Sequence, residues 1–362
     1  MNLQELRNRL SAIDRQIIDL VAERQSLVGQ IGEVKRSSRQ ATRDFAREKE
    51  VLEAARAQAM QLGLSPRLAE ALLRLLIESS LIKQEWERVR AEGKGRGQQA
   101  LVIGGAGKMG RWFAEFLDSQ GFEVTIADPG AELPGFVCVR DWRDTPDHFQ
   151  VTVIASPIAA AAGILDEIGE RGRSGLIFDV GSLKSPLEPA LRRLAKRGLL
   201  VTSVHPMFGP DTELLSGRHV LFMESGVPEA TQAARLLFDA TMAQQIEMPL
   251  EDHDRLIAYV LGLSHALNIA FFTALAESGE SLPRLIELSS TTFDAQVEVA
   301  SRVARESPEL YFEIQSGNPH GLEALHTLRD AVERISGIVE KGDQQAFVAL
   351  MQRGRAYLAR RG

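Results

Sequence analysis

Hydrophobic residues recur at steps of three, four or seven along the first 90 residues. From Leu3 to Val34 this spacing predicts one long amphipathic helix. A second helix is predicted from Thr42 or Arg43 to Gln61, with Gly63 as its stop signal. Ser65-Pro66 is a good N-cap and first-turn pair for a third helix that runs towards Trp86. The pattern therefore predicts an all-α, three-helix domain over residues 1–90.

The pattern changes after a segment rich in glycine and charge, residues 91–99, which is typical of a linker. Short apolar runs then alternate with helical patterns, and this alternation predicts a parallel, doubly wound sheet of the Rossmann type over residues 100–250. The expected strands are Ala100–Ile103, Glu123–Ala127, Val151–Ala155, Leu176–Asp179, Leu199–Val204 and His219–Met223. Residues 251–362 are helical again, and we expect them to form an all-helical domain that pairs with a second subunit.

Composition narrows the class of protein. The chain has 362 residues, a formal net charge of −7 and a single cysteine, Cys138. The negative charge argues against a nucleic-acid partner, and one cysteine excludes an intrachain disulfide or a cysteine-rich metal site. We see no signal peptide at the amino terminus and no apolar run near the roughly 20 residues that span a bilayer. The expectation is a cytoplasmic protein without a membrane partner.

The first strand of the α/β region leads into a glycine-rich loop with the pattern Gly-x-Gly-x-x-Gly, formed by Gly105, Gly107 and Gly110. In such loops the first glycine permits a tight turn, the second lets a pyrophosphate approach, and the third lets helix and strand pack closely. The amides of the following helix, at Lys108 and Met109, offer donors to phosphates. The pattern indicates a dinucleotide site.

Asp128 directly follows the second expected strand. An acid at this position binds both ribose hydroxyls and repels a 2′-phosphate, which favours NAD over NADP. Ser156 follows the next strand along the sheet and is expected beside the nicotinamide ribose. The alternative is a glycine-rich turn with a surface aspartate.

Two later strands end in segments that carry candidate chemistry. One is Asp179-Val180-Gly181-Ser182-Leu183-Lys184, and the other is Ser203-Val204-His205-Pro206-Met207-Phe208-Gly209-Pro210. Ligands of such folds bind outside the carboxyl ends of the strands. The run His-Pro-Met-Phe-Gly-Pro resembles the prephenate dehydrogenase family. The resemblance continues through His253-Asp254-Arg255, Ser264-His265 and Ala300-Ser301-Arg302-Val303, and covers Leu101 to the carboxyl end.

This resemblance implies an NAD-dependent oxidation in which the substrate loses hydride and carbon dioxide and becomes aromatic. A neutral imidazole at His205 would take the hydroxyl proton, with Ser182 orienting the ring or hydroxyl. The resemblance places Arg302 against the ring carboxylate, and His265 and Lys184 close to the site. Asp294 departs from the pattern, since some fused relatives carry a basic residue there. Tyrosine inhibition at or near the active site is a further expectation.

Each of these residues also has a structural interpretation. His205 could be a buried structural histidine, and Lys184 a surface cation. His253 could cap or brace a helix. Arg302 has Arg305 as a neighbour that could take its role. The surrounding motif favours the functional interpretation of His205.

Cations interrupt the apolar stripe of the first helix. Arg24 and Lys35 lie eleven residues apart, about three helical turns, and so share a face, whereas Arg7 faces another direction. Asp44, Arg47 and Glu48 share a face of the second helix, as Ser80 and Gln84 do on the third. The ordered set, in Leu6-Arg7, Ala22-Glu23-Arg24, Val34-Lys35, Asp44 with Arg47-Glu48, and Ser79-Ser80 with Gln84, resembles the all-helical chorismate mutase family.

That resemblance implies an intertwined homodimer in which Arg7 reaches the partner's site. Chorismate rearranges to prephenate within one molecule, so the enzyme must hold a folded dianion and stabilise charge on the ether oxygen. The resemblance implies that Arg7, Arg24 and Arg47 bind carboxylates and that Lys35 and Gln84 donate to the ether oxygen. Glu48 would bind the ring hydroxyl, and Asp44 and Ser80 would support the pocket. Neither reaction needs a metal.

The two resemblances support each other, because the product of the first reaction is the substrate of the second. Two alternatives remain open. An arogenate or other hydroxy-acid dehydrogenase with a non-catalytic helical arm would show no mutase activity. A regulatory module that binds nucleotide alone would be stabilised by NAD without reducing it. Neither alternative explains both the His205 motif and the ordered mutase set.

Overall fold

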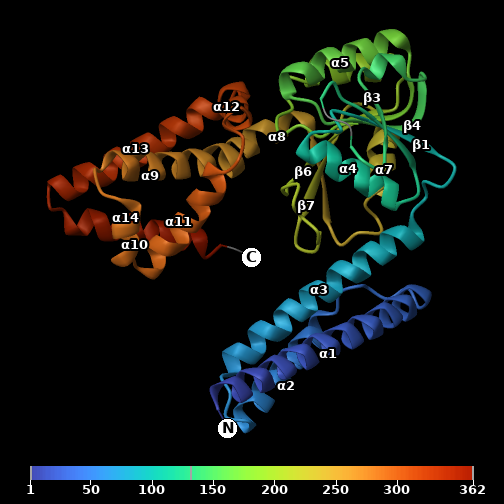
Figure 1. Cartoon of the computed structure of the whole chain (residues 1–362). Coiled ribbons are helices and arrows are strands. Elements are labelled where there is room, and N and C mark those ends of the chain that lie inside the picture. Colours follow the sequence, from blue (N-terminus) through green and yellow to red (C-terminus); the bar gives the residue numbers. More distant parts are fainter. Residues whose placement is uncertain (1, 131–132, 361–362) are drawn as a thin grey trace. The chain divides into compact units, whose positions relative to one another are not determined.

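The computed structural model describes residues 2–130 and 133–360 (Figure 1). It divides into two compact units, residues 1–181 with 190–248, and residues 182–189 with 249–362. Each unit is described by itself.

Three helices form the amino-terminal part of the first unit, as the hydrophobic spacing predicted. They are α1 (Leu3–Ser37), α2 (Phe45–Gln61) and α3 (Pro66–Glu92). The side chain of Asn2 caps α1 and the side chain of Asp44 caps α2. The predicted start of α2, Thr42 or Arg43, is therefore two to three residues early, because the Asp44 carboxylate accepts from the Arg47 amide and fixes the first turn.

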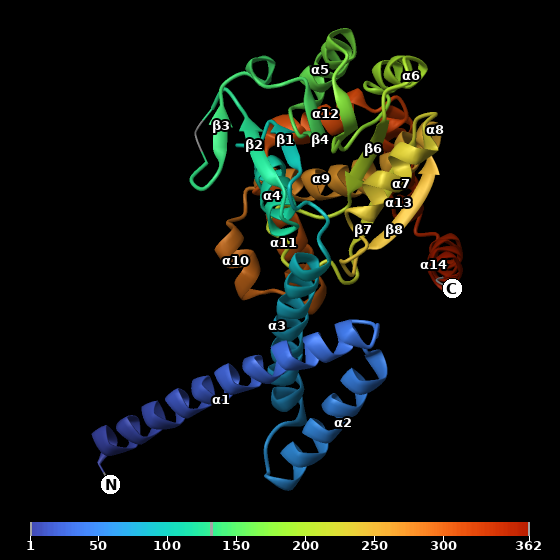
Figure 2. The same ribbon diagram turned by 90° about the vertical axis from the view of Figure 1, so that its right-hand side faces the viewer.

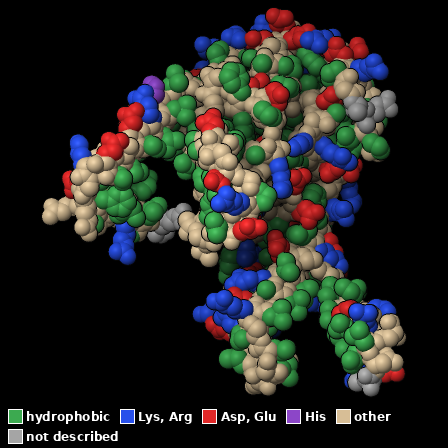
Figure 3. Space-filling model, turned by 60° about the vertical axis from the view of Figure 1, so that its left-hand side comes forward, with side chains coloured by type: hydrophobic (Ala, Val, Ile, Leu, Met, Phe, Trp, Pro, Cys, Tyr) green, Lys and Arg blue, Asp and Glu red, His purple; other side chains and the backbone are tan. Residues whose placement is uncertain are grey.

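Much of α1 lies outside the bundle. Its amino-terminal half extends past α2 and α3 (Figure 2). Large hydrophobic side chains stay exposed along α1, among them Leu3, Leu10 and Ile17, and Leu68 and Leu75 do so on α3. Figure 3 shows hydrophobic side chains on the surface of these helices, in the lower part of the view. The amphipathic stripe that the sequence predicts is thus only partly covered within one chain.

An eight-stranded sheet follows, and the doubly wound α/β class is confirmed. The strands are β1 (Gln99–Ile103), β2 (Glu123–Ala127), β3 (Val137–Val139), β4 (His148–Ile154), β5 (Ser174–Asp179), β6 (Val201–Pro206), β7 (His219–Glu224) and β8 (Gln244–Pro249). Their order is β3-β2-β1-β4-β5-β6-β7-β8. Neighbours from β3 to β6 pair in parallel, and β7 pairs with β6 in the antiparallel sense. The order reverses between β1 and β4, the switch point at which such sheets bind ligands.

The helices of this region are α4 (Lys108–Ser119), a 3₁₀ turn (Trp142–Asp144), α5 (Ile158–Arg171), α6 (Glu188–Lys196) and α7 (Pro228–Leu236). The hydrophobic core is rich in aromatic rings, with Trp112, Phe113 and Phe116 of α4 packed with Phe178 and Phe238. The six expected strands are all present. Two strands were not predicted, because β3 has only three residues and β8 is half polar and largely exposed.

The segment between α3 and β1 packs closely on the α/β region. The Gly95 amide donates to the Gln120 carbonyl. A Cβ atom at Gly93 would lie 2.6 Å from the Gln120 backbone, and one at Gly95 would lie 2.3 Å from the Phe122 ring. Glycine is thus required here by close approach.

The second unit is helical, and within its described residues it contains no strand. Its helices are α8 (Leu250–Ile257), a π-helical turn (Ala258–Leu263), α9 (Ser264–Glu277), α10 (Leu282–Glu287), α11 (Thr291–Ala304), α12 (Pro308–Gly317), α13 (Gly321–Glu340) and α14 (Gln344–Leu358). Gln315 of α12 donates to the Gly262 carbonyl in the π turn, and Gln296 of α11 donates to Asn268 of α9. These polar contacts fix α9 against its neighbours.

One helical stretch, Leu250–Glu277, is long and apolar enough to cross a membrane by length and composition, with 22% of its most apolar window buried. The expectation that no apolar run approaches this length is therefore wrong. The stretch joins α8, the π turn and α9 without a break, which the sequence pattern did not reveal.

Candidate functional site

The three amino-terminal helices line a cavity of about 260 Å³. Seven of the eight residues predicted for the mutase stand in its wall, namely Arg24, Lys35, Asp44, Arg47, Glu48, Ser80 and Gln84. They come from α1, α2 and α3, and Asp44 caps α2. Residues that helical periodicity placed on shared faces of three separate segments thus line one cavity.

Arg24 is held on the wall of this cavity by α3. Its Nη1 donates to the Leu76 carbonyl at 2.8 Å and to the Ser80 hydroxyl, while Ser80 Oγ donates to the same carbonyl at 2.5 Å. Burial lowers the pKa of Arg24 from its ordinary value, but an arginine stays protonated at neutral pH. Ser80 therefore orients a fixed positive charge.

Lys35 and Gln84 also line this cavity. Lys35 Nζ donates to the Thr42 carbonyl at 2.7 Å. Gln84 is 7% exposed, and its Oε1 has no hydrogen-bond partner among the described residues. An unpaired buried amide is costly, so this side chain is available for a polar ligand.

Glu48 is oriented by a residue that the sequence analysis missed. Arg43 donates from Nε to Glu48 Oε1 and from Nη2 to Glu48 Oε2, each at 2.9 Å, and stacks its guanidinium over the Phe45 ring. Its remaining nitrogen, Nη1, donates to Ser216 Oγ at 2.8 Å. Ser216 lies in the loop after β6, and no local pattern reveals a pair 173 residues apart.

The other predicted mutase residues lie nearer the surface. Asp44 accepts the Arg47 amide at the start of α2, and Arg47 Nη1 pairs with Glu50 at 2.9 Å. Arg7 is exposed on α1 and is not among the residues that line this cavity.

A second predicted site lies at the switch point of the sheet, as a cavity of about 950 Å³. Gly107, Asp128 and Ser156 are among its lining residues. Asp128 accepts from the Ala106 amide at 3.1 Å and from the Gly130 amide at 2.8 Å. Ser156 Oγ is buried without a hydrogen-bond partner among the described residues. A loop carboxylate and an unpaired hydroxyl fit the ribose hydroxyls of a dinucleotide.

One glycine of this loop, Gly105, is required for a different reason than the pattern suggested. The positive φ of the tight turn, 80°, belongs to Gly104 and not to Gly105. A Cβ atom at Gly105 would lie 2.6 Å from Ile126 Cγ2, and one at Gly110 would lie 2.1 Å from the Gly104 carbonyl oxygen. Gly107 is the N-cap of α4. The expectation for Gly105 is thus corrected from turn geometry to close packing.

Lys108 and Met109 form the start of α4, and the Met109 side chain packs against the hydrophobic core. Neither residue is among those that line the cavity, which come from the loop, the ends of β1, β2 and β4, residues 140–143 and α5. Their contribution to a phosphate could come only from backbone amides.

His205 is the penultimate residue of β6 and is 4% exposed. Its backbone lies opposite Leu221 of β7. The neighbouring Ser203 hydroxyl donates to Asp179 Oδ2 at 2.5 Å, and the Gly181 amide donates to Asp179 Oδ1 at 2.9 Å. The Asp179 carboxylate at the end of β5 is thus linked to β6 and to the segment that follows β5.

The second unit holds the other predicted dehydrogenase residues. Lys184 is fully buried, so it is not a surface cation, and its amide donates to Asp254 Oδ1 at 2.9 Å. The Ser185 amide donates to Asp254 Oδ2, and His253 Nδ1 lies 2.6 Å from Asp254 Oδ1. Burial acts to raise the pKa of Asp254, but these hydrogen bonds bring it well below its ordinary value. His253 braces the Asp254 carboxylate. This carboxylate anchors the segment 182–189, whose first residue is Ser182.

His265 and Arg302 differ in their surroundings. The His265 ring stacks on Tyr311 at 4.3 Å, and its Nδ1 is buried without a partner among the described residues. Burial lowers the pKa of His265. Arg302 is exposed on α11 and pairs with Glu298 at 2.5 Å. Asp294 lies in the first turn of α11 and accepts from the Ser289 hydroxyl, where an acid favours the helix dipole.

Comparisons with known proteins give matches to both parts of the chain. Residues 6–85 match the family model for chorismate mutase type II, and residues 249–353 match that for the prephenate dehydrogenase dimerization domain. The T-protein of Enterobacter agglomerans is 26% identical over 356 residues, which cover 97% of this chain and 91% of that protein. The 4-amino-4-deoxyprephenate dehydrogenase of Streptomyces pristinaespiralis is 30% identical over 275 residues, 73% of this chain and 92% of that protein.

Among solved structures, the chain is similar to prephenate dehydrogenase from A. aeolicus in complex with hydroxyphenyl propionate and NAD⁺, with a TM-score of 0.56 and 18% identity. The match covers 72% of this chain and 98% of that protein. This likeness shows the fold of the α/β and carboxyl-terminal domains. The family matches and the curated relatives define the class of protein, a Rossmann-type dehydrogenase that carries an additional helical domain. The chain belongs to the bifunctional chorismate mutase/prephenate dehydrogenase family.

Proposed function

We propose that this chain converts chorismate to prephenate and then oxidises prephenate with NAD to 4-hydroxyphenylpyruvate, carbon dioxide and NADH, two consecutive steps of tyrosine biosynthesis. The observation that carries the proposal is the cavity whose wall gathers seven predicted mutase residues in a chain that also has a Rossmann-type dinucleotide cavity. We assign the mutase to residues 1–90, the linker to 91–99, the cofactor domain to 100–250 and the helical dehydrogenase domain to 251–362.

In the mutase step, Arg24 and Arg47 bind the carboxylates of chorismate, and Arg7 completes the site of a second copy. Lys35 and Gln84 donate hydrogen bonds to the ether oxygen, where negative charge grows as the bond breaks. Glu48, held by Arg43, accepts from the ring hydroxyl. Asp44 and Ser80 support these groups. Catalysis then consists of holding the reactive conformer and stabilising the charge of the transition state.

In the dehydrogenase step, the glycine loop with Gly105, Gly107 and Gly110, the amides of Lys108 and Met109, Asp128 and Ser156 hold NAD. The unpaired Ser156 hydroxyl and the close approach at Gly110 fit this cofactor. When bound, NAD accepts the hydride that leaves C4 of the substrate ring.

His205 takes the proton of the substrate hydroxyl as hydride leaves, and Ser182 orients that hydroxyl or the ring. Arg302 binds the ring carboxylate, and we assign Lys184 and His265 to substrate binding. Lys184 is fully buried and His265 is half-buried, and this burial supports a role in substrate binding over that of a surface residue.

We further propose a cytoplasmic homodimer. The exposed apolar stripe of α1 and the match of residues 249–353 to a dimerization domain support the pairing of two copies. Tyrosine is proposed as an inhibitor that acts at or near the dehydrogenase site.

Separation of the two activities tests this proposal. His205→Asn should abolish NADH formation from prephenate and leave the conversion of chorismate to prephenate intact, so the surviving activity also verifies folding. Gln84→Ala should have the opposite effect. Loss of both activities in either variant, with the fold preserved by circular dichroism, would contradict the assignment of two separate sites. NADH from arogenate in place of prephenate would revise the substrate.

A further inference from the structure

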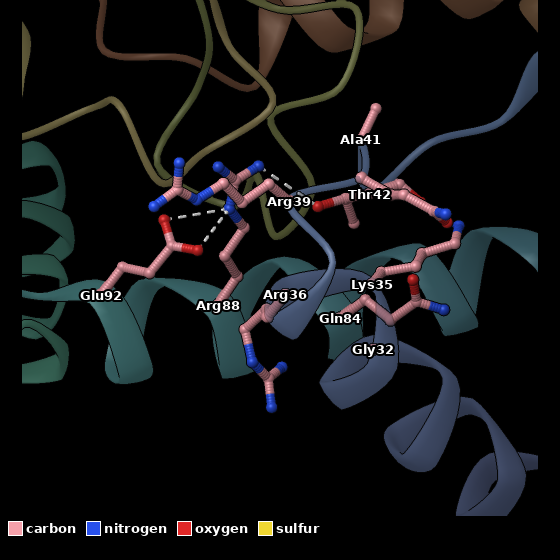
Figure 4. A pocket seen from close by; sticks show the side chains of 10 residues that line it. Gly32, Lys35, Arg36, Arg39, Ala41, Thr42, Gln84, Arg88 and Glu92 are labelled. Atoms are coloured by element: carbon pink, nitrogen blue, oxygen red, sulfur yellow. Dashed lines mark hydrogen bonds and ion pairs between the residues drawn. The ribbon is translucent and has the colours of Figure 1, made fainter.

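A second cavity of about 650 Å³ lies beside the mutase cavity, and the proposed reaction does not use it. The end of α1, the connection to α2, and α3 line it (Figure 4). Lys35, Thr42 and Gln84 stand in the walls of both cavities. A ligand in the second cavity therefore meets the same lysine and glutamine that face the mutase cavity.

The lining of this second cavity is strongly cationic. It contains Lys35, Arg36, Arg39 and Arg88, and Glu92 is its one acidic residue among those described. The whole chain carries a net charge of −7, so this concentration of cations runs against the average surface. Its non-polar lining is limited to Gly32 and Ala41. Such a cavity suits a compact anion better than an aromatic ring.

Two guanidinium groups lie close together at one side of this cavity. Arg88 Nε pairs with Glu92 at 3.1 Å, and its Nη1 reaches Thr42 Oγ1 at 3.5 Å. Figure 4 shows the Arg39 side chain extending alongside that of Arg88, whereas Arg36 points away from both. Arg39 has no side-chain ion pair among the described residues. In the described part of the chain Glu92 thus pairs with Arg88 alone, and the charge of Arg39 is left for a ligand.

The backbone at Arg39 is strained. Among residues 2–130 and 133–360, Arg39 is the one non-glycine residue with a positive φ, 54°. Arg39 follows the C-cap of α1, where the Gln40 amide donates to the Lys35 carbonyl at 2.8 Å, and glycine would adopt this left-handed conformation without strain. Two buried polar atoms in the lining, Arg36 Nη1 and Gln84 Oε1, also have no hydrogen-bond partner in the described part of the chain.

We propose that this cavity is a capture site for a dicarboxylate anion, which holds chorismate before it enters the mutase cavity. The inference rests on the proposed function. Arg39 and Arg88 bind the carboxylates, and Lys35, shared by both cavities, contacts the anion in either position. Attraction by this cluster raises the rate of encounter, and salt weakens it because the Debye length falls to about 3 Å at 1 M ionic strength.

The test compares steady-state mutase kinetics of the full-length wild type and the double variant Arg39→Gln/Arg88→Gln. At low ionic strength the variant should raise KM roughly 10-fold with kcat within about twofold, and the difference should vanish near 1 M salt. Glu92→Gln should lower KM, because it removes the one acidic residue of the described lining. Lys196→Gln, which removes an exposed cation of α6, is the matched control and should change neither constant.

NADH formation from prephenate by the same preparations verifies that each variant is folded. A double variant with the KM and salt dependence of the wild type would overturn the capture site, as would a fall in kcat at constant KM. A wild type without mutase activity would instead remove the proposed function. In that case the site can still be tested by calorimetry, in which malonate, a minimal dicarboxylate, is titrated into the Arg24→Gln variant. The triple variant that also lacks Arg39 and Arg88 should not bind it, and equal binding by both would overturn the proposal.

Discussion

The backbone N–H of Leu215 donates a hydrogen bond to the carboxylate of Glu85, 2.8 Å away, and fastens α3 to the loop that follows β6. The other oxygen of Glu85 accepts from the Met242 amide, and Trp86 Nε1 donates to the Glu213 carbonyl at 3.1 Å. Glu85 directly follows Gln84 of the mutase cavity, and the loop begins with the His205 motif. Gln84 of the mutase cavity and the loop after the His205 motif are thus joined through one helix within the first compact unit.

Removal of this carboxylate should destabilise the first unit. Burial raises the pKa of Glu85, and the two amide donors act against that shift. Glu85→Gln keeps the shape of the side chain but turns an NH₂ group towards one of the two amide donors. We therefore expect the free energy of unfolding to fall by about 1–3 kcal/mol. Urea denaturation measures it. Glu87→Gln, which disturbs only a 3.8 Å pair with Lys83, is the control, and equal losses in both variants would contradict the role of Glu85.

Arg43 should act as a positioning residue for Glu48. Arg43→Ala frees the Glu48 carboxylate, and we expect roughly a 10-fold fall in mutase kcat/KM, about 1.4 kcal/mol of transition-state stabilisation. Arg43→Lys should recover part of it, since one charged contact can remain. Ser216→Ala removes only the contact to the loop and should leave kcat/KM near the wild-type value. If Ser216→Ala matches Arg43→Ala, the contact to the loop is what matters, and the role assigned to Glu48 fails.

Asp128 should select NAD against NADP. Asp128→Ser removes the acceptor for the ribose hydroxyls and the charge that repels a 2′-phosphate. We expect KM for NAD to rise by about 10-fold, and the ratio of kcat/KM for NAD over NADP to fall by more than that. Initial rates with prephenate and each cofactor measure this ratio. An unchanged preference would show that other residues read the ribose.

His265 gives stability a defined pH dependence. Burial lowers its folded pKa below the unfolded value of about 6.5. The contribution of His265 to stability is therefore fully present above that pH and is lost as pH falls through the folded pKa. The stability difference between wild type and His265→Gln should shrink below about pH 6.5, as urea unfolding from pH 5 to 8 would reveal. A difference that grows on acidification would show that the imidazole gains protons on folding.

The sequence predicted those features that depend on local spacing. Helical periodicity placed Arg24 and Lys35 on one face of α1, and the structure brings both to the wall of one cavity with Gln84. Six strands were predicted because each is a short apolar run. β8 was missed because half of its residues are polar and four of its six are exposed. The turn at Gly104 was missed because the Gly-x-Gly-x-x-Gly pattern begins at Gly105.

Features that join distant segments could not be predicted. Arg43 belongs to no motif, and its contact with Ser216, 173 residues away, depends on tertiary packing against the loop after β6. The burial of Lys184 likewise follows from the packing of residues 182–189 within the second unit. Local patterns contain no information about such pairs, because tertiary packing determines them.

The most direct test of the central claim is NADH formation by the purified chain given chorismate and NAD, with prephenate and NAD in parallel. The account predicts NADH from both substrates. NADH from prephenate alone would contradict the mutase assignment and reduce α1, α2 and α3 to a structural arm. Absence of NADH from both substrates would contradict the assignment of the dehydrogenase reaction.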